Sequence, residues 1–101
     1  MADRVAGFDW DRGNRAKCQK HGVSIAEIET LFEGAPMVRW DRAHSGAEAR
    51  HLAIGRGASG RWIFLAFTYR SRGGATYIRP ISARYMHARE VRRYEEENPE
   101  L

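Results

Sequence analysis

The sequence predicts an α+β domain in which helices are segregated from a run of β-strands. Two helix-start signals occupy the first third of the 101-residue chain, and the second is followed by apolar residues at helical spacing. Apolar and aromatic runs separated by glycine-rich turns fill the middle, and a helical pattern returns near the end. This order predicts two N-terminal helices, an antiparallel sheet of about four strands and a C-terminal helix. A chain of this length forms one domain, which we place at 1–101.

The first elements are a short strand and a helix. Residues 6–10 predict the opening strand. Asp11 is a favoured N-cap for a helix that runs to about Lys20, and Gly22 closes it in the left-handed conformation.

A second helix follows at once. Ser24 and Glu27 have the spacing of a capping box. The apolar stripe of this helix consists of Ile25, Ile28, Leu31 and Phe32. The sequence Gly-Ala-Pro at 34–36 ends it.

The middle of the chain predicts four strands, at 37–40, 48–56, 61–70 and 75–83. The run RWIFLAFTYR at 61–70 is nearly all apolar or aromatic, so we expect it at the centre of the sheet. Pro80 lacks the N–H that a ladder needs, so its strand is either at an edge or bulged there. A last helix is expected over 86–97, with Val91 and Tyr94 on its inner face.

Two motifs have structural interpretations that outweigh functional ones. Gly55, Gly57 and Gly60 spell G-x-G-x-x-G, but a strand rather than a helix follows, so they predict a hairpin turn. Cys18 and His21 form C-x-x-H without a second ligand pair, and we therefore expect neither a metal nor a cofactor. His44 and His51 are left as spare imidazoles.

Basic residues are concentrated in the second half of the chain. Between Arg50 and Tyr94 there are ten arginines and one acid, Glu90. The planar guanidinium binds phosphate bidentately and stacks on bases, so this excess points to RNA. The alternative is an arginine-rich surface that only solubilises the protein. No run is apolar enough for a membrane helix or a signal peptide, and the single cysteine cannot form an internal disulfide, so we expect a cytoplasmic protein without membrane contact.

Several basic and hydroxyl residues on or beside the strands are suited to RNA cleavage without a metal. The substrate's own 2′-OH is the nucleophile, so the protein needs a base, an acid and cations for the phosphorane. His21 is either such an acid or base, or a helix-end histidine favoured by the dipole. The arginines either stabilise the transition state or bind the RNA backbone.

Segments along almost the whole chain resemble one family. They are 8–11 (FDWD), 20–24 (KHGVS), Leu31-Phe32, Glu48 and Arg50, 53–55 (AIG), 67–70 (FTYR), 81–84 (ISAR), and Glu90 with Tyr94. In this order and spacing the chain resembles the BrnT toxins of type II toxin–antitoxin systems. The sequence departs from the family pattern at Pro80, where an aliphatic residue is usual.

The resemblance implies a RelE-like fold with helices on one side of the sheet, and metal-independent endoribonuclease activity on messenger RNA. It implies a BrnA-type antitoxin as partner, in a hetero-oligomer that contacts operator DNA only through the antitoxin. We expect catalysis from His21, Glu48, Arg50, Arg70 and Arg84. In this hypothesis Arg84 and Arg70 stabilise the scissile phosphate, His21 is the acid or base, and Glu48 is either a second one or orients Arg50. RNA binding is expected from Lys20, Arg79, Ser82, Arg89 and Arg93. The alternative function is a non-catalytic basic module that binds nucleic acid or a partner within a repressor complex.

Overall fold

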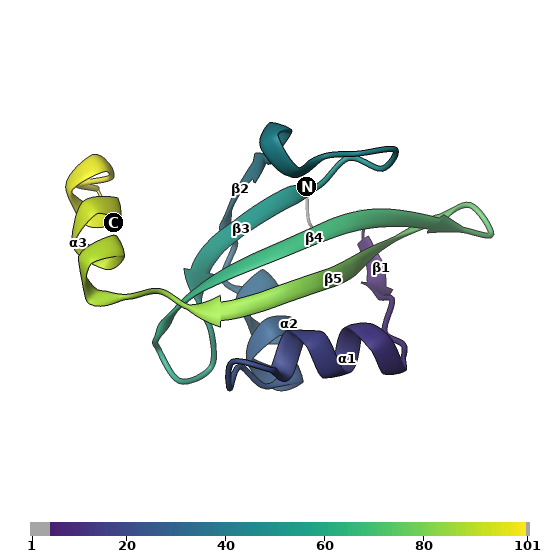
Figure 1. Ribbon diagram of the computed structural model, residues 1–101, viewed down its shortest axis with the longest axis horizontal. Helices are drawn as coiled ribbons and strands as arrows, with labels where there is room; N and C mark the ends of the chain where they lie inside the picture. Colours follow the sequence, from purple (N-terminus) through teal and green to yellow (C-terminus); the bar gives the residue numbers. More distant parts are fainter. Residues whose placement is uncertain (1–4, 101) are drawn as a thin grey trace.

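A five-stranded sheet with two helices on one face forms the body of the molecule (Figure 1). The computed structural model describes residues 5–100. In chain order the elements are β1 (Val5–Phe8), α1 (Arg12–Gln19), α2 (Ile25–Glu33), β2 (Met37–Trp40), the 3-10 turn η2 (Arg42–His44), β3 (His51–Arg56), β4 (Trp62–Arg72), β5 (Ala75–Tyr85) and α3 (Ala88–Glu97). The strands lie in the order β1-β5-β4-β3-β2.

The α+β class is confirmed, but the expected antiparallel sheet of about four strands is a mixed sheet of five. Strands β2 to β5 are antiparallel, whereas β1 lies parallel to β5, with Val5 opposite Thr76 and Phe8 opposite Ile78. A parallel neighbour requires a crossover, and here the chain leaves β1 through α1 and α2 before it builds the meander.

Strand β4 is the central strand, as its composition predicts. Its alternate residues Ile63, Leu65 and Phe67 are fully buried and face α1 and α2. These helices contribute further core residues, namely Cys18, Val23, Ile28 and Leu31. The Cys18 thiol is fully buried, and this burial raises its pKa to about 11, so it is a structural residue rather than a reactive one.

A bulge in β5 settles the two alternatives for Pro80. Ser82 lies opposite Ala66 and Pro80 opposite Phe67, so Ile81 is the extra residue between them. The strand is therefore bulged near its proline, and Pro80 is buried against the helices. Beyond the bulge, Ser82 and Arg84 pair with residues of β4 that face away from α1 and α2.

Asn14 ties α1 to this bulged strand. Its side-chain amide donates to the main-chain oxygens of Asp9 and Pro80, both at 2.9 Å. The same side chain accepts a 2.7 Å bond from the backbone N–H of Asp11, which completes a capping box with Asp11 as the predicted N-cap. Gly22, with φ of 90°, closes the helix as expected.

Glu27 joins α2 to the turn between β3 and β4. Ser24 caps the helix, but Glu27 does not complete the expected capping box. Its carboxylate instead accepts from the N–H and hydroxyl of Ser59, at 2.9 and 3.1 Å. This close approach explains Gly57, where a Cβ would lie 2.5 Å from the Glu27 carboxylate. The glycine-rich segment is thus the predicted hairpin turn.

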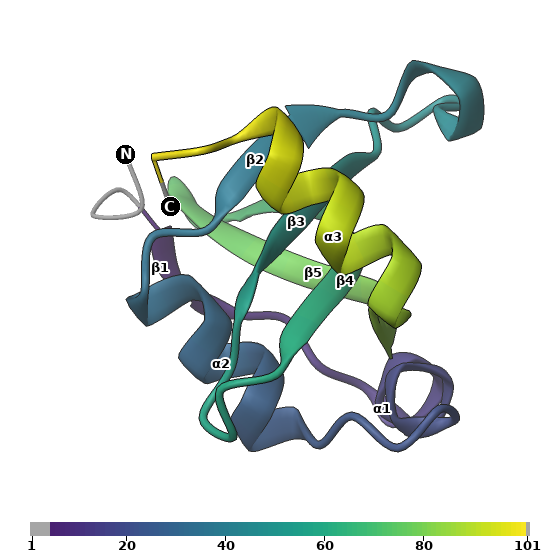
Figure 2. The same ribbon diagram turned by 90° about the vertical axis from the view of Figure 1, so that its left-hand side faces the viewer.

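Helix α3 departs from the expected arrangement with all helices on one side. It begins at Ala88 rather than 86 and lies across one end of the sheet, on the face opposite to α1 and α2 (Figure 2). Tyr94 is buried as predicted: its ring packs edge-on against Trp62 with centroids 5.2 Å apart, and its hydroxyl contacts the Met37 sulfur. Val91 is only half-buried.

We predict that Asn14→Ala lowers the free energy of unfolding by about 2–4 kcal/mol, because two buried carbonyls lose their donor and α1 loses part of its cap. Denaturant titration measures the change. Gln19→Ala is the matched control, since this exposed amide bonds only within the same helix. Equal stability of the two variants would show that Asn14 does not hold α1 in place.

Candidate active site

The open face of the sheet carries a small groove of about 250 Å³. Its walls come from the end of α1, the η2 turn, the middle of β3 and β4, and the end of β5. The lining residues are His21, Asp41, His44, Arg50, Leu52, Phe64, Ala66, Ser82, Ala83 and Arg84. Leu52, Phe64 and Ala66 are neighbours on β3 and β4, so the floor is apolar and the rim is charged.

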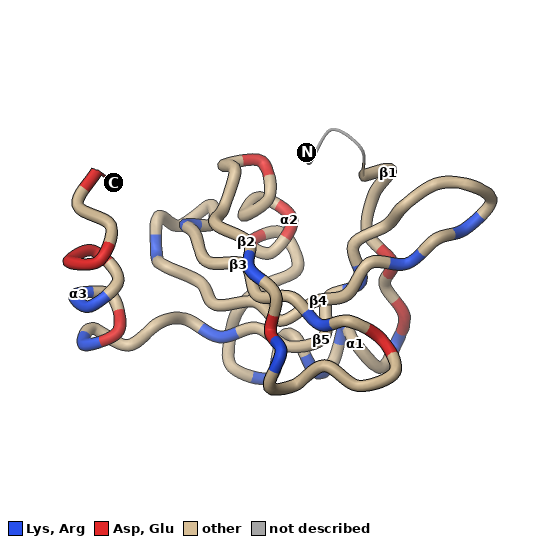
Figure 3. Tube along the Cα trace, turned by 90° about the horizontal axis from the view of Figure 1, so that it is seen from above, with Lys and Arg blue, Asp and Glu red and all other residues tan. Residues whose placement is uncertain are grey.

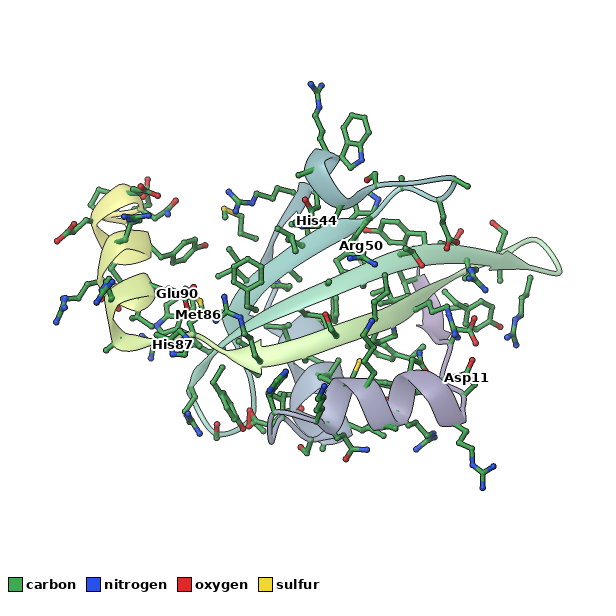
Figure 4. The ribbon with its side chains drawn as sticks, viewed as in Figure 1. Asp11, His44, Arg50, Met86, His87 and Glu90 are labelled. Atoms are coloured by element: carbon green, nitrogen blue, oxygen red, sulfur yellow. The ribbon has the colours of Figure 1, made fainter. Side chains whose placement is uncertain are left out.

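Four residues predicted for the site meet in this groove, namely His21, Arg50, Ser82 and Arg84. His21 is exposed and follows α1, whereas Ser82 and Arg84 lie beyond the β5 bulge. Arg50 immediately precedes β3, and Figure 4 shows it above the sheet, on the same side as His44. Residues up to 63 positions apart in the sequence thus line one cavity.

Arg84 is held in a fixed orientation by Glu90. Its two terminal nitrogens donate to the two carboxylate oxygens at 2.8 and 2.9 Å, and its guanidinium lies 5.1 Å from the Phe64 ring centroid. The ion pair lowers the pKa of Glu90 from 4.5 to about 2, helped by the N–H of His87, and raises the pKa of Arg84. A guanidinium has five N–H donors, so some remain for a phosphate.

The η2 turn adds His44 to the groove, together with Asp41, which directly precedes the turn. His44 Nδ1 lies 3.1 and 2.9 Å from the two oxygens of Asp41. The Asp41 side chain is 12% exposed and that of His44 is 66% exposed. Consequently the groove is lined by two imidazoles, His21 and His44, and by the side chains of Arg50 and Arg84.

A comparison with protein families identifies the chain. The family model described as the ribonuclease toxin, BrnT, of type II toxin–antitoxin systems matches residues 10–90. The chain belongs to the BrnT toxin family. This membership makes it a ribonuclease toxin of a type II system, which has an antitoxin protein as its partner. A search of curated proteins gave no significant match.

Two other predicted residues of this BrnT toxin lie outside the groove. Arg70 on β4 donates to Glu48 at 2.7 and 3.3 Å, and the pair lowers the pKa of Glu48. Of the two roles expected for Glu48, acid or base and orientation of Arg50, the second is not seen, because Glu48 bonds to Arg70. Both side chains are nearly half exposed, so solvent screens their attraction.

The residues expected to bind RNA are spread around the groove. Lys20 is exposed beside His21, and Arg89 and Arg93 are exposed on α3, where they line a neighbouring cavity. Arg79 lies 2.7 Å from Asp11 and 3.7 Å from Asp9, so it is partly neutralised. Figure 3 shows lysines and arginines along the whole molecule, from the β4–β5 hairpin to α3, with acidic residues among them.

Three residues of this part of the BrnT toxin are not predicted from the sequence: Asp41 and His44, which line the groove, and Glu90, which holds Arg84. In the sequence His44 is only a spare imidazole, and nothing there predicts a role for Asp41 or a bond between Glu90 and Arg84. The available signal was the i, i+3 spacing of Asp41 and His44, which brings both side chains to one side of a helical turn. Glu90 is close to Arg84 only because the chain turns sharply between β5 and α3.

Within residues 5–100, no three His, Cys, Asp or Glu side chains are grouped so as to hold a metal ion. The same part of the chain contains no helix that is long and apolar enough to cross a membrane.

The Arg84–Glu90 pair gives a prediction for the titration of Glu90. The lowered pKa means that the pair stabilises the folded protein above about pH 4.5, and that this contribution is lost as the pH falls towards 2. NMR of the Glu90 carboxyl carbon in the folded protein should give a midpoint of about 2. Arg84→Gln should return the midpoint towards 4.5, whereas Arg92→Gln, on an exposed position of α3, should not. A wild-type midpoint near 4.5 would contradict the pairing.

Proposed function

We propose that this toxin is a metal-independent endoribonuclease that cleaves messenger RNA in the groove of the open sheet face. The observation that carries the proposal is the convergence of His21, Arg50 and Arg84 on one cavity with an apolar floor. Family membership supports ribonuclease activity in general. The groove supports a particular place and chemistry for it.

The chemistry of RNA cleavage needs only groups that these residues possess. The 2′-OH attacks the adjacent phosphorus, so the protein does not have to generate a nucleophile. Arg50 and Arg84 supply positive charge next to the phosphorane oxygens, where fixed donors lower the barrier most. An imidazole transfers a proton near neutral pH. The apolar floor offers Leu52 and Ala66 to a base or sugar, because the Arg84 guanidinium already lies over the Phe64 ring.

Binding of the RNA on either side of the scissile phosphate falls to the surrounding cations. Lys20 extends the groove past His21, and Arg89 and Arg93 extend it along α3. Ser82 lines the groove and offers a hydroxyl donor to a phosphate oxygen. Arg79 contributes less, because Asp11 already takes one of its donor groups.

We further propose that the partner is a BrnA-type antitoxin and that the complex contacts operator DNA only through that antitoxin. Strand β2 is at the edge of the sheet and carries the exposed apolar residues Met37 and Trp40, which are 37% and 54% exposed. Edge strands and exposed apolar side chains are features that a bound partner covers.

Cleavage of end-labelled RNA by the purified toxin in EDTA tests the proposal. We expect cleavage to persist without metal ions and to slow by about 10²–10³-fold in Arg84→Ala, as when one fixed transition-state donor is removed. Arg84→Lys should recover only part of the rate, since it keeps the charge and loses the planar fork. Arg15→Ala, which removes an exposed arginine from α1, is the control and should cleave normally.

Two outcomes would overturn the proposal in different ways. Cleavage that stops in EDTA and returns with a divalent ion would refute metal independence. Wild-type rates in folded Arg84→Ala would show that the site lies elsewhere. If the folded wild-type protein leaves RNA intact and induction does not arrest growth, the chain is a binding module instead.

A further inference from the structure

The Asp41–His44 pair has a defined geometry, but the proposed function assigns no role to it. Both carboxylate oxygens of Asp41 lie within 3.1 Å of the same ring nitrogen, His44 Nδ1. His44 lines the groove together with Arg50 and Arg84, yet its side chain is 66% exposed. An exposed histidine with a fixed partner is not required by the core, so its position calls for another explanation.

The turn that carries this pair is rigidly connected to the sheet. The backbone N–H of Asp41 donates to the main-chain oxygen of Arg50 at 2.8 Å. The Ser45 hydroxyl donates to the main-chain oxygen of Asp41 at 2.7 Å. The same hydroxyl accepts from the backbone N–H of Arg50 at 2.9 Å and from Trp40 Nε1 at 3.1 Å. These bonds fix the distance between the turn and the start of β3. The backbone positions of His44 and Arg50 are therefore fixed relative to each other.

The carboxylate also decides which ring nitrogen is free. An ionised Asp41 only accepts hydrogen bonds, so Nδ1 of His44 must carry the proton that it donates. In the neutral ring, Nε2 then has the lone pair and is able to take up a proton. A carboxylate that fixes the tautomer of a histidine in this way is a recurrent arrangement in proton-transfer sites.

We propose that His44 is the general base of this ribonuclease and that Asp41 is its positioning residue. The inference rests on the proposed function and assigns one of its two proton transfers. His44 Nε2 removes the proton from the 2′-OH as the O2′–P bond forms. The P–O5′ bond breaks, and the leaving O5′ takes a proton from a general acid, for which His21, the second imidazole of the same groove, is the candidate. The products are a 2′,3′-cyclic phosphate and a 5′-hydroxyl.

The charged groups around the groove agree with these roles. Arg50 and Arg84 line the same groove as the two imidazoles, and there they stabilise the negative charge that develops on the phosphoryl oxygens. Arg42, on the same turn as His44, stacks over Trp40 at 4.9 Å instead of pairing with Asp41. The Asp41 carboxylate is thus left to pair with His44.

Single-turnover cleavage of two matched substrates tests the assignment of the base. One is an ordinary RNA oligonucleotide, and the other carries sulfur in place of the scissile 5′-bridging oxygen, so that its leaving group needs no acid. We expect His44→Ala to slow cleavage of the ordinary substrate by about 10²–10⁴-fold with a similar KM. The sulfur should not restore this loss. The loss in His21→Ala should be largely restored, since only the acid becomes unnecessary.

Each of the other outcomes counts against the inference. A wild-type rate in His44→Ala would remove His44 from the reaction. Rescue of His44→Ala by the sulfur substrate would make it the acid rather than the base. A wild-type protein that cleaves neither substrate would overturn the ribonuclease proposal itself, and the assignment with it. Ala43→Ser, at an exposed position of the same turn, is the control and should cleave both substrates normally.

The role of Asp41 has a spectroscopic test. In ¹⁵N NMR spectra of the wild-type protein, recorded at a pH at which the His44 ring is neutral, His44 should be the Nδ1–H tautomer. Asp41→Asn should bring in the Nε2–H tautomer and reduce kcat by about 10–100-fold while KM changes little, as for other groups that orient a functional imidazole. An unchanged tautomer and an unchanged kcat in the folded variant would show that Asp41 only supports the turn.

Discussion

The hydrogen bonds of Asn14 to the carbonyls of Asp9 and Pro80 are the constraint on which the site depends. The bulge next to Pro80 changes the course of β5, and a proline at this point withholds an N–H from the sheet. Asn14 joins the bulged strand to α1, with one amide reaching both the end of β1 and the middle of β5. The end of α1, which carries His21, is thereby placed beside Ser82 and Arg84.

Carboxylates hold the functional groups of the groove in position. Glu90 fixes the guanidinium of Arg84, and Asp41 fixes the imidazole of His44. In both cases the acid takes only part of the donor capacity of its partner, so the free N–H groups and the free ring nitrogen remain available to a substrate. Such an arrangement needs little reorganisation when charge develops on a bound phosphate. It also explains why two acidic residues, Asp41 and Glu90, lie beside the cations of a groove that we propose binds an anion.

Local patterns predict the parts of this fold that depend on local chemistry. The apolar run of β4, the cap at Asp11, the glycine turns and the irregularity at Pro80 all follow from single residues or short periodicities. The parallel pairing of Val5 with Thr76 does not, because no local pattern records which strand edge a distant segment joins. The same limit applies to the site. The arginines of the groove stand out by composition, whereas Glu48 bonds to Arg70 across 22 residues. His44 is recognised as a candidate only from its place in the lining of the groove.

NMR titration with a short RNA that carries a 2′-deoxy sugar at the scissile position tests most directly whether the groove binds substrate. This analogue lacks the nucleophile, so it binds without being cleaved. We expect the side-chain signals of Arg50, Arg84 and the two imidazoles, His21 and His44, to shift together. We also expect binding to weaken steeply with salt. The signals of Arg15, on the far side of α1, should not move. Shifts confined to β2 and the outer face of α3, with the groove unaffected, would contradict this account.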